Sequence, residues 1–405
     1  MNSRIWFLPR SGQRALLAAL AVAGTLCLPS SGVETSSAAG DPVIVAAGDI
    51  ACDPKSSSFN GGNGESSRCR QRFTAGLLKG ATAVLPLGDN QYENGDHAKY
   101  RKSYARSWGA YKGITRPVPG NHEYLTSGAK GYFDYFGAVA AERGKGYYSF
   151  DLGAWHLIAL NSEIDADAGS AQERWLRADL AVTRKSCILA YWHKPRFSSG
   201  VHGNDADFDA FWRALYAARA DVVLTGHDHD YERFGLQNPD ARADPKGIRA
   251  FVVGTGGRSL RDFSSPEPNS QVRSSEAFGV LRMTLHPGSY EWKFVPEKGA
   301  FTDSGKTTCH RAATALVLSS FSAKRTLKGV LVRWRTSGGT SIRGFNLYRE
   351  QSGRRVRVNG AVIAASGRAY SWLDRSASKG ALRYRLQAVD VQGRKSWLGT
   401  APVKS

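Results

Sequence analysis

Short apolar runs recur along residues 42–310, and a glycine or a polar residue follows closely after each of them. Six of the runs have the length of buried β-strands: 42–47, 81–87, 155–160, 187–192, 221–224 and 250–253. Stretches with helical character lie between them at 71–79, 171–183 and 205–220. Sheets that alternate with helices build their sites at the carboxyl ends of the strands. The pattern therefore predicts an α/β domain whose site is formed by the residues that follow these runs.

The periodicity changes near residue 314, where apolar positions begin to alternate with other residues. Apolar side chains occupy every second position in 330–334 and 382–388, and glycine-containing turns separate such runs. About seven short strands in some 90 residues are typical of an antiparallel β-sandwich. The stretch resembles a fibronectin type III domain, with Trp334 on an early core strand and Tyr384 on a late one. We therefore expect an α/β domain at 41–312 and an all-β domain at 313–405.

Residues 1–40 have the composition of an export signal. Arg4, Arg10 and Arg14 precede a 14-residue apolar run at 15–28, and small residues follow at 36–39. This order predicts a signal peptide and a secreted, extracellular or periplasmic protein. A short membrane anchor is the alternative. No apolar run reaches the roughly 20 residues that a membrane-spanning helix needs, so we expect no transmembrane segment.

Four cysteines remain once this segment is set aside. An even number of cysteines in an exported chain indicates disulfides, and four cysteines allow three pairings. We favour Cys52–Cys69, which closes a short Gly/Ser-rich loop, together with Cys187–Cys309, which ties a strand to the end of the same domain. Four unpaired thiols are the alternative.

The chain is basic, with 55 Lys and Arg residues against 35 Asp and Glu residues and a formal net charge of +20. Residues 1–40 contribute three Arg and one Glu, which leaves +18 without them. A basic surface can attract nucleic acid, an acidic cell-wall polymer or a phosphorylated substrate. No block of five like charges occurs, so we expect no specific nucleic-acid binding. Cell-wall association through the C-terminal domain is a further expectation.

Five polar motifs follow the apolar runs in order. They are Gly48-Asp49, Gly88-Asp89-Asn90-Gln91-Tyr92, Gly120-Asn121-His122-Glu123, His193 and Gly226-His227-Asp228-His229. A Gly-Asp pair alone is a common turn, whereas His-x-His can present two imidazoles to neighbouring metals. Two ions about 3.5–4 Å apart need a bridging carboxylate and a mixed nitrogen and oxygen shell. Taken together, the motifs predict a two-metal centre.

Four other histidines do not fit this pattern. His97, His156, His286 and His310 have no ligand partners near them in the sequence. We interpret them as structural or surface residues.

The motifs are similar to those of the calcineurin-like metallophosphoesterase family and, within it, of the purple acid phosphatases. Tyr92 stands three residues after Asp89, which is the mark of that subfamily, and His202 follows His193 by nine residues. The resemblance covers about residues 43–309. It implies a four-layer sandwich with mixed β-sheets. The first motif departs from the family, because Asp49 is followed by Ile-Ala-Cys.

Carried over residue by residue, the resemblance implies a site with two ions. A ferric ion would be held by Asp49, Asp89, Tyr92 and His229. A divalent Fe, Zn or Mn ion would be held by Asp89, which bridges, and by Asn121, His193 and His227. In addition, His122 and His202 would contact the substrate as the catalytic pair.

The residue types also suit phosphate ester chemistry on their own. Two cations neutralise an anionic ester and make hydroxide available near neutral pH, so a metal-bound hydroxide can attack phosphorus. His202 could then protonate the leaving oxygen or orient the phosphate. His122, with Asp228 or Glu123 as an acidic partner, could do either instead, and the sequence leaves the choice open.

We therefore expect a secreted hydrolase of phosphate monoesters, acting on a phosphorylated small molecule or polymer. A phosphodiesterase, nucleotidase or phospholipase with the same site is one alternative, because the metals contact only the phosphate. A cell-wall or anionic-polymer binding protein on a phosphatase fold is another.

Overall fold

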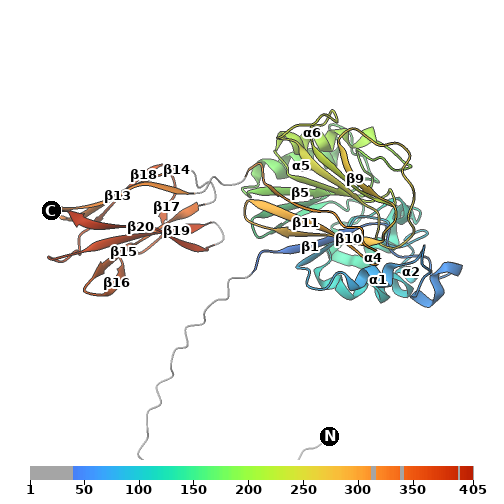
Figure 1. Cartoon of the computed structure of the whole chain (residues 1–405), viewed down its shortest axis with the longest axis horizontal. Coiled ribbons are helices and arrows are strands. Elements are labelled where there is room, and N and C mark those ends of the chain that lie inside the picture. Colours follow the sequence, from blue (N-terminus) through green and yellow to red (C-terminus); the bar gives the residue numbers. More distant parts are fainter. Residues whose placement is uncertain (1–39, 312–315, 338–341, 391–392, 405) are drawn as a thin grey trace, which may run out of the picture. The chain divides into compact units, whose positions relative to one another are not determined.

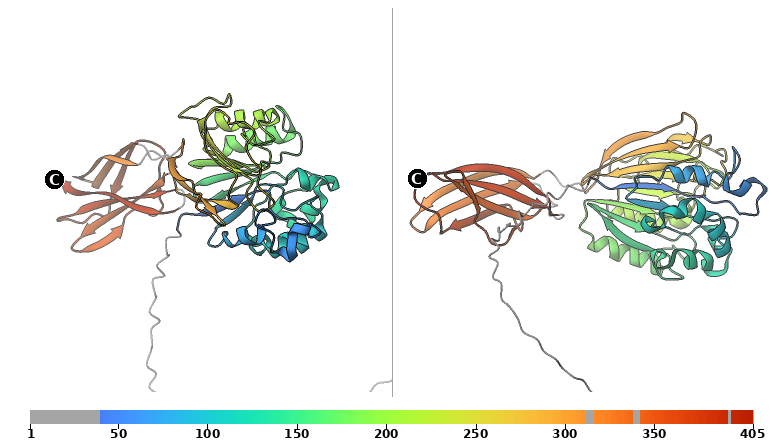
Figure 2. Two further views of the ribbon diagram at one scale, coloured as in Figure 1. Left: turned by 45° about the vertical axis from the view of Figure 1, so that its right-hand side comes forward. Right: turned by 90° about the horizontal axis from the view of Figure 1, so that it is seen from below.

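The computed structural model describes residues 40–311, 316–337, 342–390 and 393–404. Within residues 40–311, two mixed β-sheets pack against each other and helices cover their outer faces (Figures 1 and 2). This arrangement confirms the expected mixed-sheet sandwich. The first sheet has the order β12-β11-β10-β1-β2. Its strands are β1 (Val43–Ala47), β2 (Ala83–Pro86), β10 (Gly279–Leu285), β11 (Ser289–Pro296) and β12 (Ser304–Thr308).

The second sheet has the order β3-β4-β5-β6-β8-β7-β9. Its strands are β3 (Tyr148–Leu152), β4 (Trp155–Ala159), β5 (Cys187–Tyr191), β6 (Val222–Thr225), β7 (Tyr231–Gln237), β8 (Ile248–Val253) and β9 (Ser270–Ser274). Strands β4, β5, β6 and β8 are parallel neighbours, as are β1 and β2 in the first sheet. Both faces of these strands are covered, which explains why their sequences are continuous apolar runs.

Helices flank the two sheets, with α5 and α6 beside the second sheet and α1, α2 and α4 beside the first (Figure 1). The helices are α1 (Gln71–Gly76), α2 (His97–Lys102), α3 (Asn121–Tyr124), α4 (Lys130–Phe136), α5 (Ala171–Val182) and α6 (Asp209–Ala217). Short 3-10 segments are η1 (Ser57–Gly62), η2 (Tyr104–Arg106), η3 (Trp108–Ile114), η4 (Ser127–Ala129), η5 (Gly137–Ala140) and η6 (Ala206–Phe208). The helix expected at 71–79 ends early, at Gly76, and the one expected at 205–220 is divided between η6 and α6.

Both favoured disulfides are present. Cys52 is bonded to Cys69 and Cys187 is bonded to Cys309. Cys187 begins β5 in the second sheet, whereas Cys309 directly follows β12 at the edge of the first. The second bond therefore ties the two sheets together across a separation of 122 residues.

The C-terminal part is all-β, as expected. Its strands are β13 (Val317–Thr326), β14 (Gly329–Ser337), β15 (Ile342–Gln351), β16 (Arg354–Arg357), β17 (Ile363–Ala364), β18 (Ala369–Asp374), β19 (Arg383–Asp390) and β20 (Lys395–Lys404). The alternation read from the sequence places Val330, Val332 and Trp334 of β14 in its core, with Tyr384 and Leu386 of β19. The fibronectin type III resemblance and the domain boundary at 312/313 stay predictions.

The expected signal peptide falls on residues 1–39, which lie outside the described part of the chain. Among the residues that the structure describes, no helix is both long and apolar enough to cross a membrane.

Candidate metal centre

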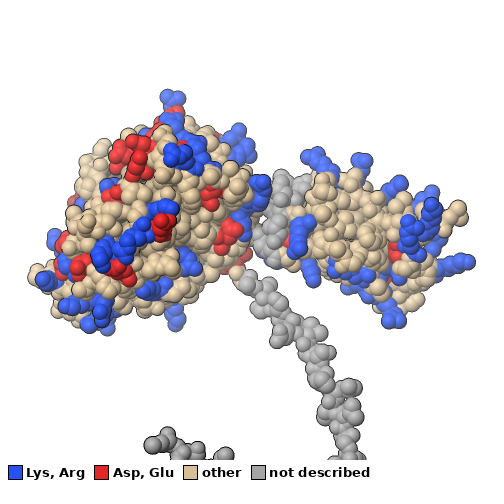
Figure 3. Space-filling view, turned by 180° about the vertical axis from the view of Figure 1, so that it is seen from behind, with Lys and Arg blue, Asp and Glu red and all other residues tan. Residues whose placement is uncertain are grey.

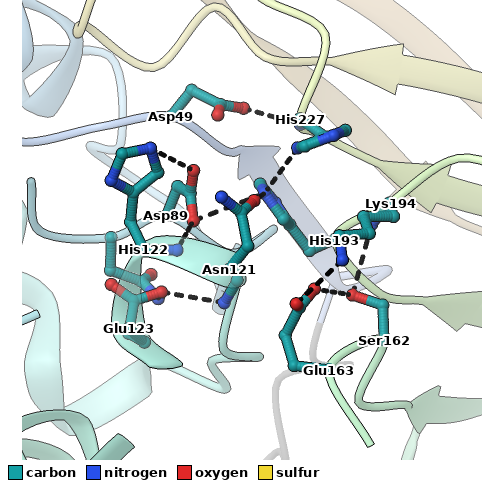
Figure 4. Close-up of polar contacts among 12 residues, drawn as sticks. Asp49, Asp89, Asn121, His122, Glu123, Ser162, Glu163, His193, Lys194 and His227 are labelled. Atoms are coloured by element: carbon teal, nitrogen blue, oxygen red, sulfur yellow. Dashed lines mark hydrogen bonds and ion pairs between the residues drawn. The ribbon is translucent and has the colours of Figure 1, made fainter. Parts of the chain in front are cut away.

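The polar loops after β1, β2, β5 and β6 come together at one place (Figure 4). Asp49 and Asp89 follow the parallel neighbours β1 and β2 of the first sheet. His193 and His227 follow the parallel neighbours β5 and β6 of the second. Carboxyl ends of parallel strands lie at the same edge of a sheet, so packing the two sheets brings the four loops together.

Two glycines permit this close approach. Gly88 has a φ of +83°, and a Cβ there would lie 2.5 Å from the His193 ring. A Cβ on Gly120 would lie 2.3 Å from Oδ1 of Asp89. Any larger residue at these two positions would push the loops apart, which is the physical reason for the glycines before Asp89 and Asn121.

Three atoms that could bind a metal lie around the hydroxyl oxygen of Tyr92, which is a fourth. Its Oη lies 2.8 Å from Oδ1 of Asp49, 3.0 Å from Oδ2 of Asp89 and 3.1 Å from Nε2 of His229. Oδ1 of Asp49 is in turn 3.3 Å from Nε2 of His229. All four residues are buried.

A second group of atoms that could bind a metal lies around Nε2 of His193. This atom lies 3.1 Å from Oδ1 of Asn121, 3.2 Å from Nδ1 of His227 and 3.4 Å from Oδ1 of Asp89. Asp89 therefore presents one carboxylate oxygen to each group. The structure brings together all seven predicted ligand residues, in the two sets that the family resemblance implied.

The donor set suits a pair of metal ions. Ligands bound at about 2.1 Å and at right angles to one another are about 3 Å apart, which is close to the separations within both groups. Asp89, His193 and His227 also offer atoms that all lie within 4.8 Å of one another. One group is rich in oxygen donors and includes a phenol, whereas the other has two imidazoles, so the two positions favour different ions.

Hydrogen bonds outside these groups orient the imidazoles. Nδ1 of His193 lies 2.8 Å from the carbonyl oxygen of Leu87, and Nδ1 of His229 lies 2.9 Å from Oγ of Ser259. In each ring the other nitrogen, Nε2, points at the predicted metal ligands: those around Tyr92 for His229, and Asn121, His227 and Asp89 for His193. Such partners fix the ring and the tautomer of a ligating histidine.

The electrostatics of the site favour cations. Burial raises the pKa of Asp89, but positive charge on His193 and His122 outweighs it and holds the pKa below its ordinary value. Burial lowers the pKa of His193, yet the Asp89 carboxylate raises it to about 10. Burial and the charge on His193 lower the pKa of His227 to about 3. The buried carboxylates therefore stabilise a positive charge at this site.

The two predicted catalytic histidines lie on either side of this centre and are partly exposed. The His122 ring packs on Tyr92 with 4.3 Å between ring centroids. The His202 ring stacks on His227 with 4.0 Å between centroids. Their side chains are 25% and 37% exposed, so both can meet a molecule that enters from solvent. Among the predicted ligands, Asn121 and His227 are half-buried and the other five are buried.

Neither acidic partner suggested for His122 contacts it. Asp228 is hydrogen-bonded to His202 instead. Its Oδ1 lies 2.7 Å from Nδ1 of His202 and 3.0 Å from the His202 backbone nitrogen. Nδ1 of His122 contacts the backbone carbonyl oxygen of Glu93. The suggestion was wrong because Asp228 and Glu123 are close to the ligands in sequence but point away from His122 in the fold.

The comparisons with known proteins agree with this geometry. Residues 42–231 match the model of the calcineurin-like phosphoesterase family. This part of the chain is a calcineurin-like phosphoesterase domain. The phosphoesterase domain is similar to Purple acid phosphatase 22 of Arabidopsis thaliana, with 36% identity over 152 residues that cover 35% of each chain. Purple acid phosphatase 18 of the same plant is 34% identical over 142 residues, 33% of this chain and 32% of the relative.

The fold also has a counterpart among solved structures. A purple acid phosphatase isolated from yellow lupin (Lupinus luteus) seeds matches with a TM-score of 0.54 and 20% identity. The match covers 66% of this chain and 53% of that chain. These findings confirm the resemblance read from the motifs. The chain spans about a third of the length of the two curated relatives.

Glu123 has a role in the phosphoesterase domain that the motif did not reveal. This buried carboxylate accepts hydrogen bonds from the backbone nitrogens of Gly120 (2.8 Å) and Gln91 (3.1 Å) and from the Tyr100 hydroxyl (3.0 Å). It thereby joins the loop that carries Asp89 to the loop that carries Asn121. Its place beside a predicted ligand motif was the only sequence signal, and that signal does not indicate which way the side chain points.

The four histidines that were not assigned to the site are structural or surface residues, as expected. His156 bridges Asp151 and Asp179, at 2.8 and 2.7 Å. The other three are an exposed residue at the start of α2 (His97), a partner of Asp41 (His286) and a hydrogen-bond donor to the backbone carbonyl oxygen of Gly247 (His310).

Proposed function

We propose that this protein is an exported, binuclear-metal phosphoesterase that hydrolyses phosphate monoesters. The observation that carries the proposal is the arrangement of seven donor residues in two groups that share Asp89. A fold kept only for binding has no physical need for such a set. The purple acid phosphatases among the relatives support the same reading.

In this proposal, Asp49, Asp89, Tyr92 and His229 hold Fe(III), and Asp89, Asn121, His193 and His227 hold divalent Fe, Zn or Mn. A phenol is a suitable ligand for ferric iron, and imidazoles suit the divalent ions. Bound ions would neutralise the ester's charge and supply a water-derived nucleophile near neutral pH.

The chain's own residues then bind and orient the ester. Asp228 occupies Nδ1 of His202, so Nε2 is the nitrogen left to meet the substrate. That nitrogen lies 3.4 Å from a guanidinium nitrogen of Arg261. The pair can hold phosphate oxygens on the His227 side. Once a phosphate oxygen takes the Arg261 N–H in place of Nε2, His202 can hold a proton at Nε2 for the departing oxygen. His122 takes the corresponding place on the Tyr92 side.

The cellular setting is also part of the proposal. The two disulfides fit an oxidising compartment, which agrees with export through the predicted signal at residues 1–40. The substrate is a phosphorylated small molecule or polymer outside the cell membrane.

Hydrolysis of matched mono- and diesters by purified residues 41–405, from pH 4 to pH 9, tests the proposal. Monoester turnover that is lost in Asp89→Asn and in His193→Ala supports it. A preference for diesters would keep the metal centre and overturn the monoester assignment. Bound metal without turnover of either ester would favour a binding protein on a phosphatase fold.

A further inference from the structure

The positive charge of the chain is concentrated in its C-terminal part. Residues 313–405 hold 18 Lys and Arg residues against 3 Asp and Glu residues, an excess of 15 out of the net +20. Figure 3 shows the same bias, with blue side chains over the C-terminal strands and few red ones on the face drawn. Although no block of like charges occurs in the sequence, the charge is therefore far from evenly distributed.

Strand alternation decides which of these charges share a face. Phe345 and Leu347 of β15, with Tyr384 and Leu386 of β19, point into the core. Successive side chains of a strand point to opposite faces, so the residues that alternate with these core positions point outward on the β16-β15-β19-β20 sheet. The outward set is Tyr348, Glu350, Arg355, Arg357, Arg383, Arg385 and Trp397.

The outward residues form two cross-strand rows. In one row Tyr348 is paired with Arg357 on one side and Arg385 on the other. In the next row Glu350 is paired with Arg355 and Arg383. Neighbouring rows on one face of a strand are about 7 Å apart. We call these four arginines, with Tyr348, Glu350 and Trp397, the arginine face.

Three of the four arginines of this face are held in place, and the arginines remain in excess over Glu350. Glu350 contacts Arg355 at 2.6 Å, Arg383 at 2.7 Å and Arg385 at 3.7 Å, so one carboxylate serves three guanidinium groups. The Arg385 and Arg355 guanidinium carbons lie 4.2 and 5.1 Å from the centroid of the Trp397 ring. A hollow of about 630 Å³ lies beside them and is lined in part by Glu350, Arg355 and Arg383. Side chains ordered in this way lose little entropy when they bind an anion.

The outward face of β14 is a natural comparison within the same domain. It carries Arg333 and Arg335, both exposed. Their cross-strand neighbours are Ser322, Ser371, Ser320 and Ala369, which are small side chains without charge. Both sheet faces are basic. The arginines of the β14 face have small uncharged neighbours, whereas arginines of the arginine face share the carboxylate of Glu350.

We propose that the arginine face binds an anionic polymer whose repeating units are linked by phosphate. Guanidinium groups match phosphate oxygens with two parallel hydrogen bonds, and 13 of the 18 cations in residues 313–405 are Arg. A polymer lets several rows bind successive charges at once. The choice of phosphate over carboxylate rests on the proposed phosphoesterase function, because a phosphate polymer would keep the enzyme where phosphate esters are abundant.

A nucleic acid fits this face less well than a polymer without bases. Proteins that bind single strands leave aromatic rings free for bases to stack on. The Trp397 ring is 41% exposed, but two guanidinium groups and the Tyr348 ring already lie against it. Recognition would thus depend on phosphate contacts, without a requirement for bases.

The test is binding of the full chain to immobilised poly(glycerol phosphate) at several salt concentrations. Arg357→Gln/Arg385→Gln leaves the Glu350 pairs with Arg355 and Arg383 intact. It should weaken binding at least tenfold and reduce the slope of log affinity against log salt by about two. The matched control, Arg333→Gln/Arg335→Gln, removes the same charge from the other face and should change affinity less than twofold. Circular dichroism and hydrolysis of a soluble aryl phosphate should be unchanged in both variants.

Equal losses in the two variants would overturn the proposal, because attraction would then depend on net charge alone. Tighter binding to polygalacturonate, to oligothymidylate or to phosphatidylglycerol vesicles would also overturn it, in favour of a carboxylate polymer, a nucleic acid or a membrane. Binding is measured separately from hydrolysis. A chain that binds the polymer without hydrolysing any ester would therefore keep this inference and reject the proposed function.

Discussion

Tyr92 is the residue that distinguishes this metal centre from one built only of carboxylates and imidazoles. Its hydroxyl lies within 3.1 Å of donor atoms from Asp49, Asp89 and His229. Burial and the two carboxylates raise the pKa of the phenol, so only a strongly charged ion would bind it as phenolate.

Replacing Tyr92 tests whether that ion is ferric. A phenolate bound to Fe(III) gives a visible charge-transfer band, so the iron-loaded protein should be coloured and Tyr92→Phe should lose the band. Hydrolysis should fall about tenfold, the lower end of the effect of a misplaced metal ligand. Visible absorption and iron content are measured together, with Tyr147→Phe as control. A band that survives in Tyr92→Phe would show that the assignment is wrong.

Glu123 is not a predicted ligand, but it supports the loops that carry Asp89 and Asn121. In Glu123→Gln an amide NH₂ would replace one oxygen and face the N–H or O–H groups that now donate to it. We expect a loss of about 1–3 kcal/mol in the free energy of unfolding. Metal affinity or activity should fall about 10–100-fold. Tyr100→Phe, which removes one of these donors, is the milder control, and equal effects of the two variants would contradict this role.

The difference between motif residues and their partners shows what could be read from the sequence. Most of the predicted ligands could be found because they follow an apolar run at a strand end, whereas Asn121 begins α3 and was recognised from its motif alone. Asp228 and Glu123 could not be assigned, because their roles depend on which loop packs opposite them. Asp228 is adjacent to both His227 and His229 in sequence, yet it contacts His202, 26 residues away.

At the scale of elements, the two disulfides constrain loops of very different length. The sequence separation is 17 for Cys52–Cys69 and 122 for Cys187–Cys309. In the chain-entropy model the longer loop gives the larger stabilisation, about 5 kcal/mol against about 3 kcal/mol. Cys52, however, lies three residues after Asp49, so the short loop is next to the metal centre.

We therefore expect the two double Cys→Ser variants to fail in different ways. Cys187→Ser/Cys309→Ser should lower the free energy of unfolding more, whereas Cys52→Ser/Cys69→Ser should lower activity more. Urea unfolding and hydrolysis rates of both variants, under identical conditions, check this. The opposite ranking in either measurement would show that the loop positions do not divide these roles.

His156 links β4 to β3 and α5 through an ion pair that depends on pH. Burial alone would lower its pKa, but the Asp179 and Asp151 carboxylates outweigh burial and raise it above the ordinary value of 6.5. A raised histidine pKa stabilises the fold fully below pH 6.5 and loses this contribution as pH rises through the raised value. The difference in Tm between the wild type and His156→Gln should therefore shrink above pH 6.5. A difference that stays constant from pH 5 to pH 9 would contradict the ion pair.

The continuous apolar runs were the most reliable guide to the elements, and helix ends the least. The buried runs became strands within one or two residues, because their apolar side chains face helices on one side and a sheet on the other. The helix expected to continue to residue 79 ends at Gly76, where the chain turns back toward β2. That end is decided by packing, which local composition does not record.

At the scale of the whole molecule, the predicted metal ligands and most of the positive charge lie in different parts of the chain. Every predicted ligand lies between Asp49 and His229, and the two sheets that position them are complete at β12. Residues 41–312 carry a formal net charge of only +3, whereas residues 313–405 carry +15. The charge could have been counted from the sequence, but the arginine face could not be recognised without the strand pairing.

This separation predicts the behaviour of a chain that ends after residue 311. It keeps the seven ligands, the His202–Asp228 pair and both disulfides, so kcat/KM for a soluble aryl phosphate should remain within about twofold of the full chain. Its attraction to anionic polymers should fall steeply, because most of the positive charge is gone. Hydrolysis and polymer binding are measured on the same preparations, with circular dichroism as the control for folding. If the truncated chain is folded but no longer hydrolyses the small ester, the C-terminal strands take part in catalysis. The proposed assignment of hydrolysis to one part of the chain and polymer binding to the other would then be wrong.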